Sequence, residues 1–168
     1  MLLETIYFTA PAWLSNTLAA FLCYFFRKKK ILLMKPMDFG FKIKGKRFFG
    51  DNKTICGCLI TLISASLIGL IQNQLFLGFI MGLSVIVGTL LNSFLKRRLN
   101  IIDGGNFFPF DQVDYALSII TVIKSMELKF VFFDPLIFLI FVFIYQLSIN
   151  LIAFKFGFIN RFLEWKRA

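Results

Sequence analysis

The sequence predicts an all-α integral membrane protein that forms one domain, residues 1–168, with about five transmembrane helices. Three observations support this class. Apolar residues make up 58% of the chain and its mean hydropathy is +0.79. Several stretches of about 20 residues contain no Asp, Glu, Lys or Arg, and about 20 apolar residues suffice to cross the hydrocarbon core of a bilayer. The basic residues are concentrated in a few connecting segments, as in membrane proteins of fixed orientation.

Four of the predicted spans are long, apolar and free of charged residues: 6–26, 55–71, 75–95 and 135–154. Residues 1–26 lack a positively charged start, so we expect a helix of the mature protein rather than a signal peptide. Pro11 is expected to kink this helix or to mark its start. In the third span, Gly78 and Gly82 have the spacing of small residues that allow close packing of helices.

The remaining predicted span, the fourth in chain order, is shorter. Its apolar run starts at Tyr115 and reaches only Ile123 before Lys124, Glu127 and Lys129 appear. The sequence leaves two alternatives: a short helix with these charges at the far interface, or a helix that ends near Phe133.

The distribution of basic residues predicts the orientation. Five crossings place 17 of the 19 Lys and Arg residues on one side of the membrane, ten of them within residues 27–54. Lys and Arg are retained on the cytoplasmic side of short loops. We therefore expect a multi-pass protein of the cell membrane with its N-terminus outside and its C-terminus in the cytoplasm. The net charge of +10 follows from this bias and from attraction to anionic headgroups, so no nucleic-acid partner is expected.

Both long polar loops would then face the cytoplasm and could form one site. The first contains Pro36-Met37-Asp38-Phe39-Gly40 and continues from Gly45 to Thr54. Its glycines let backbone N–H groups approach a phosphate, and Lys46, Arg47 and Lys53 can neutralise it. A P-loop is excluded, because two residues separate Gly50 from Lys53. A basic loop lying on the membrane would explain the Lys and Arg residues but not Asp38 and Asp51 among them.

The second loop ends in a pair of aspartates. Asp111 and Asp114 are three residues apart, so they share one face if the fourth helix begins near Asp111. Two carboxylates on one face can bind a hard divalent cation, and Mg²⁺ is the expected metal. The alternative is that one of them only caps the helix.

Together these segments resemble the CDP-archaeol synthase family, membrane cytidylyltransferases that use CTP and are related to CDP-diacylglycerol synthase. The resemblance rests on Pro36–Gly40, Lys46-Arg47, Gly50-Asp51-Asn52-Lys53-Thr54 and Pro109-Phe110-Asp111-Gln112-Val113-Asp114. The wider cytidylyltransferase pattern is also present, from Ser93 and Lys96-Arg97 through Asp103 and Gly105 to Phe108-Pro109. Ile102 stands where the diacylglycerol enzymes have Lys, and Cys56 precedes Gly57 where the archaeol branch favours Arg.

The resemblance implies transfer of CMP from CTP to an anionic lipid phosphate, with release of pyrophosphate. It implies Mg²⁺ on Asp111 and Asp114, and phosphate contacts from Lys53, Lys96 and Arg97. It places Asp38 and Asp51 at the metal or beside the basic residues. Substrate contacts or loop shape are implied for the rest of the motif: Gly40, Lys46, Arg47, Gly50, Asn52 and Thr54.

Other functions remain open at this point. The lipid could be an isoprenoid ether, as in 2,3-di-O-geranylgeranylglyceryl phosphate, or the fatty-acyl ester phosphatidate. A non-catalytic membrane anchor or assembly protein needs no acidic loops. A transporter would carry ionisable residues within its spans, and the four clear spans have none. A CDP-alcohol phosphotransferase would show four spaced aspartates on one helix. The sequence also leaves a homo-oligomer open.

Overall fold

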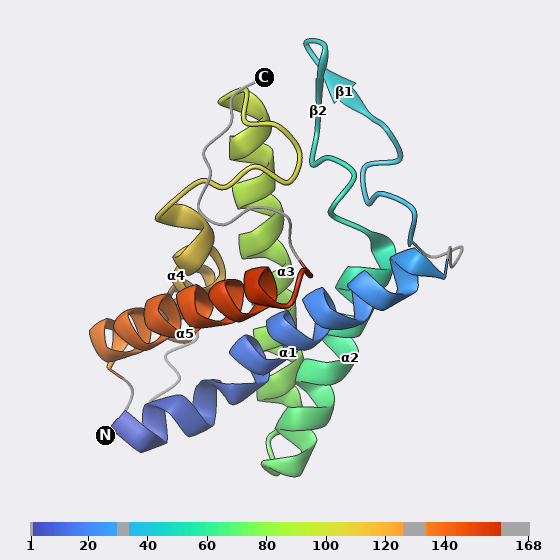
Figure 1. Cartoon of the computed structure of the whole chain (residues 1–168). Coiled ribbons are helices and arrows are strands. Elements are labelled where there is room, and N and C mark those ends of the chain that lie inside the picture. Colours follow the sequence, from blue (N-terminus) through green and yellow to red (C-terminus); the bar gives the residue numbers. More distant parts are fainter. Residues whose placement is uncertain (1, 30–33, 126–133, 159–168) are drawn as a thin grey trace.

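The computed structural model describes residues 2–29, 34–125 and 134–158. Five helices and one small hairpin make up this part of the chain (Figure 1). In chain order the elements are α1 (Leu2–Lys28), β1 (Lys42–Ile43), β2 (Lys46–Arg47), α2 (Ile55–Ile71), α3 (Leu75–Arg98), α4 (Phe110–Ser125) and α5 (Pro135–Lys155). The all-helical prediction is confirmed, and the antiparallel β1–β2 hairpin is an addition to it.

The helices α1, α3 and α5 are long and apolar enough to cross a membrane, and α2 is a shorter apolar helix. The bounds of α2 are those expected from the sequence. The helix α3 continues three residues beyond the apolar run, so Lys96, Arg97 and Arg98 form its last turn rather than a loop. This position is favourable, because basic side chains interact well with the negative end of a helix dipole.

The helix α4 begins at Phe110, five residues before the expected apolar run. Asp111 therefore lies in its first turn, and Asp114 follows three residues later on the same face. The helix is described as far as Ser125, with Lys124 in its last turn. Glu127, Lys129 and Phe133, which bear on where this segment ends, lie outside the described residues.

Pro11 lies inside α1 rather than at its start. Proline has no backbone N–H, so the carbonyl four residues earlier, that of Tyr7, loses its helical donor. The side chain of Gln72 replaces it, since its Nε2 donates to the Tyr7 carbonyl oxygen at 2.5 Å. The end of α2 therefore compensates the missing hydrogen bond of α1.

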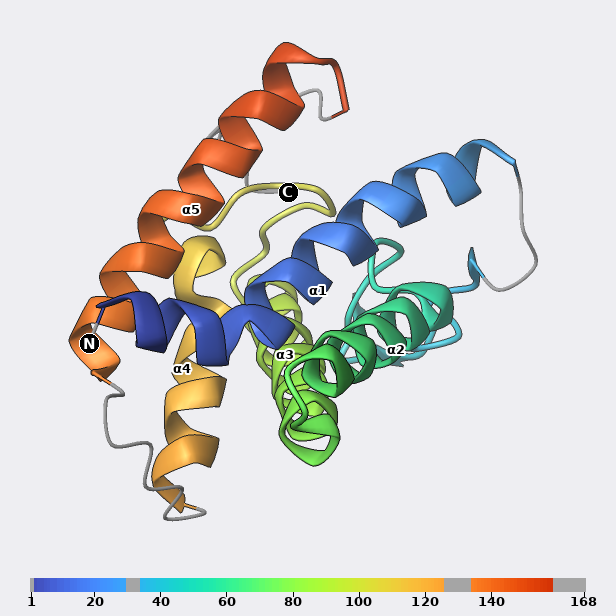
Figure 2. The same ribbon diagram turned by 90° about the horizontal axis from the view of Figure 1, so that it is seen from below.

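The helices α2 and α3 pack side by side through glycines (Figure 2). A Cβ atom added at Gly78 would lie 2.5 Å from the carbonyl oxygen of Ala65 and 2.8 Å from the Cα of Gly69. One added at Gly82 would lie 3.0 Å from the Cβ of Ala65. The predicted close packing is confirmed, and the partner helix belongs to the same chain.

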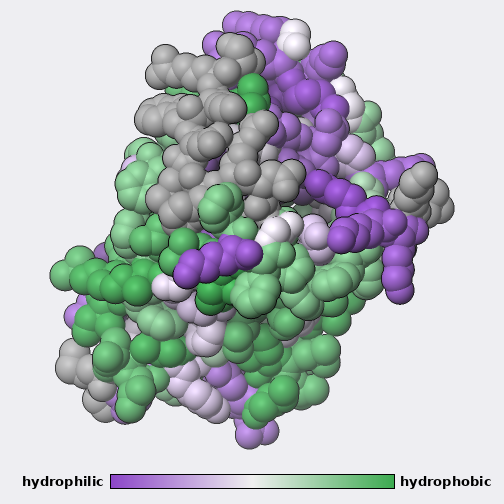
Figure 3. Space-filling view, in the orientation of Figure 1, coloured by the Kyte–Doolittle hydropathy of each residue, from purple (hydrophilic) through white to green (hydrophobic). Residues whose placement is uncertain are grey.

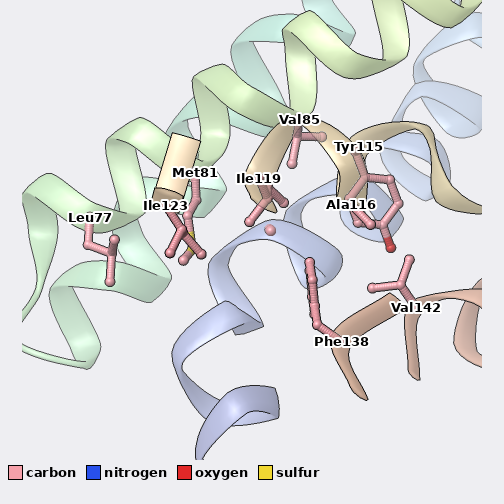
Figure 4. Close-up of a cluster of buried hydrophobic side chains, with 10 residues drawn as sticks. Leu77, Met81, Val85, Tyr115, Ala116, Ile119, Ile123, Phe138 and Val142 are labelled. Carbon is pink, nitrogen blue, oxygen red and sulfur yellow. The ribbon is translucent and has the colours of Figure 1, made fainter. Parts of the chain in front are cut away.

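The buried core joins α3, α4 and α5, with Ala12 from α1 (Figure 4). Tyr115 and Ile119 of α4 lie between Val85 of α3 and the α5 side chains, of which Phe138 is fully buried. Large apolar side chains are also exposed along every helix, as expected for surfaces that face lipid. Figure 3 shows the hydrophilic residues gathered over the hairpin end of the molecule, away from the hydrophobic surface of the helices.

Candidate active site

A cavity of about 630 Å³ lies among α1, α3, α4, α5 and the two polar loops. Its charged lining residues are Arg27, Lys53, Lys96, Arg97, Asp103, Asp111 and Asp114. They come from α1, α3, α4 and both loops, and four of the seven are cationic. A smaller cavity of about 180 Å³ shares Asn52 and Lys53 with it and adds Thr54. The prediction that the two loops share one site agrees with this arrangement.

The two carboxylates of α4 converge on one amide group of α3. Asn92 donates through Nδ2 to Asp111 Oδ1 at 2.6 Å and to Asp114 Oδ2 at 3.0 Å. Lys96, one turn after Asn92, contacts both oxygens of Asp111, at 3.1 and 2.9 Å. In residues 34–125, Asp114 makes no direct ion pair. Two carboxylates this close repel each other unless a cation is near, so Lys96 and Lys53 stabilise the pair.

The donor chemistry fits a magnesium ion. Mg²⁺ prefers oxygen ligands and commonly takes one or two carboxylates from the protein, with the rest from water and substrate phosphates. Asp111 and Asp114 meet this requirement as a pair, because one amide of Asn92 bonds to both of them. No group of three or more metal-binding side chains is present among the described residues. A metal here would therefore take its remaining ligands from water or the substrate.

Lys53 reaches the cavity from the loop just before α2. Thr54 caps this helix by accepting a hydrogen bond from Gly57 N at 3.1 Å. The backbone is pinned there too, because Met37 N donates to the Lys53 carbonyl at 2.7 Å. Burial lowers the pKa of the Lys53 ammonium, and the Asp114 carboxylate opposes this shift while Lys96 adds to it. Lys53 is thus a fixed, partly desolvated cation beside the aspartate pair.

Asp103 joins the two loops to each other. Its carboxylate accepts from Asp51 N at 2.5 Å and from Asn52 Nδ2 at 3.0 Å. Asn52 in turn accepts from Arg27 Nη1 of α1 at 2.8 Å. Gly50 is required here, because its φ is +99° and a Cβ atom would lie 3.0 Å from Asp103. This network ties α1 and both loops together at the edge of the cavity, which Arg27, Asn52 and Asp103 line.

Asp38 shapes the first loop from within. Its side chain is 1% exposed and pairs with Arg47, whose Nη2 lies 2.7 Å from Oδ1. Backbone N–H groups of Gly40, Phe49 and Gly50 also donate to it, at 2.9 to 3.1 Å. Burial alone would raise the pKa of Asp38, but these donors hold the pKa well below its ordinary value. Asp38 is therefore an internal anion of the loop.

Replacing Asp38 with Asn is expected to destabilise the protein by roughly 3 kcal/mol at pH 7, because Arg47 loses its buried partner. The folded pKa of Asp38 lies below the unfolded value of about 3.9. Its stabilisation is therefore present above pH 4 and is lost as the pH falls below it. Thermal denaturation in detergent should show that the melting temperatures of the wild-type protein and the Asp38→Asn variant converge toward acid pH.

Asp51→Asn is the control. The Asp51 side chain is 69% exposed, so its pair with Arg47 contributes little to stability. Equal losses in both variants at pH 7 would contradict this role.

Arg98 attaches the hairpin to the end of α3. It donates to the carbonyl oxygens of Ile43, Lys46 and Arg47 at 2.8 to 3.3 Å. In return, Lys46 Nζ donates to the Arg98 carbonyl at 3.1 Å. Phe48 packs on the ring of Phe94 with a centroid distance of 5.0 Å. The hairpin thus has a fixed position on α3.

The structure brings six of the predicted residues to the larger cavity: Asn52, Lys53, Lys96, Arg97, Asp111 and Asp114. Thr54 lines the smaller one. The other predicted residues shape the first loop and do not line either cavity: Asp38, Gly40, Lys46, Arg47, Gly50 and Asp51. Asp51 lies at the surface, paired with Arg47 at 2.8 Å.

Some lining residues were missed from the sequence. Arg27 was counted among the basic residues of 27–54 that orient the chain and was not assigned to the site, and Asn92 was not singled out. Its spacing could have indicated Asn92, because it lies four positions before Lys96 and therefore on the same face of the helix. The same spacing relates Gln146 to Asn150 on α5, and both line the cavity.

A family model described as CarS-like CDP-archaeol synthase matches residues 1–162. A curated CDP-archaeol synthase of Pyrobaculum islandicum is 33% identical over 112 residues, which cover 61% of this chain and 68% of that protein. One from Saccharolobus solfataricus is 30% identical over 106 residues, covering 59% of this chain and 64% of that protein. The chain thus aligns with about two thirds of the length of these relatives.

A solved structure is similar over nearly the whole chain. It is described as an intramembrane enzyme for archaeal membrane lipid biosynthesis. The TM-score is 0.64 with 25% sequence identity, and the match covers 91% of this chain and 94% of that one. The helical arrangement is therefore shared.

Proposed function

The chain belongs to the CDP-archaeol synthase family, multi-pass membrane enzymes that use CTP to form CDP-activated lipids, and we propose that it transfers CMP to an ether-linked isoprenoid glycerol phosphate. The products are a CDP-archaeol-type lipid and pyrophosphate. One observation carries the proposal: Lys53, Lys96 and the Asp111–Asp114 pair meet in one cavity although they come from three separate elements. Such a site suits the transfer of a nucleotidyl group between anionic substrates.

In this reaction an oxygen of the lipid phosphate attacks the α-phosphorus of CTP. A new P–O bond forms, the bond between the α- and β-phosphates breaks, and pyrophosphate leaves with the electron pair. The attacking phosphate is already anionic at neutral pH, so no strong base is needed. Catalysis therefore consists of positioning and of neutralising negative charge.

The cavity residues divide these tasks. Lys53, Lys96 and Arg97 bind and orient phosphates by charge-assisted hydrogen bonds. Asn92 holds the two carboxylates of α4 in register, and Asp111 and Asp114 would hold Mg²⁺. When bound, the metal supplies a Lewis acid that stabilises charge on phosphate oxygens. Asn52 and Asp103 position the two loops around the nucleotide, while Asp38, Gly40, Lys46, Arg47, Gly50, Asp51 and Thr54 shape the first loop.

The site faces the cytoplasm in this proposal, with five crossings, the N-terminus outside and the C-terminus inside. Support comes from the distribution of basic residues, of which ten lie within residues 27–54. CTP is a cytoplasmic metabolite and cannot cross a bilayer unaided, so this orientation also gives the site access to its substrate.

The test uses membrane vesicles of a host that lacks the activity. Inverted vesicles that contain the protein should release pyrophosphate from added CTP and 2,3-di-O-geranylgeranylglyceryl phosphate. Right-side-out vesicles should do so only after permeabilisation, and EDTA should silence both. Vesicles without the protein are the control. Faster turnover of phosphatidate would show that the substrate is an acyl ester. Activity in sealed right-side-out vesicles would show that the site faces outward. If no lipid phosphate were turned over, the protein would be a non-catalytic anchor.

A further inference from the structure

Three apolar side chains are exposed on the first loop, between α1 and the hairpin. Phe39 is 75% exposed and Phe41 is 59% exposed, and Met37 is exposed as well. We call these three residues the loop face. In Figure 1 this segment lies between the end of α1 and β1, at the edge of the molecule beside the start of α2. An exposed cluster of large apolar side chains commonly marks a binding surface.

The hydrogen bonds of the loop fix this exposure. Phe39 has a φ of +47°, in the left-handed region that is unfavourable for a bulky side chain. Its amide donates to the Pro36 carbonyl at 3.1 Å, and the Phe41 amide donates to the Asp38 carbonyl at 2.7 Å. Between these two turns, the Asp38 carboxylate accepts from Gly40 N at 3.1 Å. The fold therefore holds the loop face at the surface although its backbone is strained there.

Backbone contacts place the loop face at the level where α2 begins. Pro36 pairs with Thr54 in an isolated antiparallel bridge, and Ile55 N donates to the Lys35 carbonyl at 3.1 Å. Ile55 is the first residue of α2, and the apolar run of that helix starts with it. The loop face follows directly after Pro36 in the chain. Its side chains therefore lie near the end of the apolar helices and not at the tip of the hairpin.

The end of α3 indicates the same level independently. Arg98, which holds the hairpin through three carbonyl oxygens, lies three residues after Leu95, the last apolar residue of this helix. The separation is about 4.5 Å along the axis at 1.5 Å per residue. The polar layer on each side of the hydrocarbon core is roughly 5–8 Å thick, so the base of the hairpin falls within it.

The charges around the loop face match an anionic surface. Every exposed charged side chain from residue 34 to 45 is a lysine. Asp38, which argued in the sequence against a loop lying on the membrane, is buried and paired with Arg47. Asp51 lies outside this stretch and pairs with Arg47 too. Apart from glycines, the exposed residues of this stretch are thus lysines and the loop face.

We propose that the loop face inserts into the headgroup layer of the bilayer that the protein spans, where anionic lipids attract the lysines. Phe and Lys are combined in the same way on amphipathic helices that lie in this layer, with the rings toward the acyl chains and the ammonium groups toward the phosphates. The contact seats the first loop, whose far end carries Asn52 and Lys53, on the membrane. The inference uses no step of the proposed reaction, so it stands or fails separately from that function.

The test compares tryptophan at two matched positions of the full chain. Phe39→Trp places the probe in the loop face, and Lys44→Trp places it at the tip of the hairpin. Both residues are exposed and have similar φ values, +47° and +51°. Each variant is reconstituted in phosphatidylglycerol vesicles with and without brominated acyl chains, and the wild-type spectrum is subtracted to remove the two native tryptophans. The brominated lipid should quench the Phe39→Trp emission, which should also lie at shorter wavelength, and should leave the Lys44→Trp emission unquenched.

A change of headgroup tests the role of charge. In brominated phosphatidylcholine the quenching of Phe39→Trp should be weaker, because a zwitterionic surface attracts lysines less than an anionic one. Equal quenching in both lipids would contradict a contribution from the lysines.

Two results would overturn the proposal. An unquenched Phe39→Trp emission would mean that the loop face meets water or an acidic protein partner instead of lipid. Equal quenching of Phe39→Trp and Lys44→Trp would mean that the whole hairpin lies on the bilayer and that the loop face is not a separate surface. Phe41→Trp makes the same test if Phe39→Trp does not fold, since it keeps an aromatic ring beside Phe48, whose centroid is 6.1 Å away.

Discussion

Replacing either Asp111 or Asp114 with Asn is expected to lower CTP turnover by roughly a hundredfold or more while the protein remains folded in the membrane. The exchange is nearly isosteric, but an amide oxygen does not supply the negative charge that a magnesium site requires. Turnover should recover in part at raised Mg²⁺ or with Mn²⁺. Initial rates over a range of metal concentrations would measure this.

The two variants differ in what else they lose. Asp111→Asn also removes the ion pair with Lys96, whose Nζ lies 2.9 Å from the carboxylate. Asp114→Asn removes no direct ion pair of residues 34–125, so it reports more cleanly on metal binding. Asp134→Asn is a matched control, because Asp134 caps α5 by accepting from Leu136 N and Ile137 N. A cap that stays polar costs under about 1 kcal/mol. Wild-type rates for both site variants at limiting Mg²⁺ would show that the pair serves the helix and not the metal.

Lys53→Met is expected to lower turnover roughly ten- to a hundredfold, the range for losing a hydrogen bond to a charged group of about 1.5–3 kcal/mol. Methionine keeps the long apolar stem, so packing in the cavity wall is retained. The loss should appear in CTP-dependent turnover without loss of folded protein, as expected when one phosphate contact is removed.

Lys42→Met controls for the general effect of charge in the same loop. Lys42 is exposed on β1 and outside both cavities. If Lys53 were only one of the ten basic residues that orient the chain, the two variants would behave alike, because nine basic residues remain in either case. Equal and nearly wild-type rates would remove Lys53 from the active site.

The bounds of a helix could be predicted where an uncharged run was flanked by clear polar residues. The α2 segment has no charged residue and lies between Thr54, a good cap, and Gln72, so its bounds were read correctly. The extension of α3 through Arg98 was not, because three consecutive basic residues at the end of an apolar run are equally compatible with a loop. In the structure, Arg98 at the end of this turn is held by the carbonyl oxygens of the hairpin, and Lys96 pairs with Asp111.

The sequence predicted many of the residues at the candidate site but few of the contacts between them. The spacing of Asp111 and Asp114 placed them on one helix face, and the structure shows them sharing Asn92. Asp38 resembled a ligand in sequence, yet its partner Arg47 lies nine residues away across a hairpin, which no local pattern reveals. Arg27 contacts Asn52 at a separation of 25 residues, so its position at the cavity depended on tertiary packing.

The attachment of the β1–β2 hairpin to α3 has a practical consequence for imaging. Small membrane proteins give electron cryo-microscopy images with few features to align, and a rigid external marker solves this. The turn at Lys44 and Gly45 protrudes from the helices (Figure 1), and apart from its two chain neighbours no described residue has a heavy atom within 4 Å of a Cβ built at Gly45. Because Arg98 holds both strands through their carbonyl oxygens, an epitope inserted at this turn would move with α3 rather than independently of it. An antibody fragment bound there would report the orientation of the helices without covering the cavity.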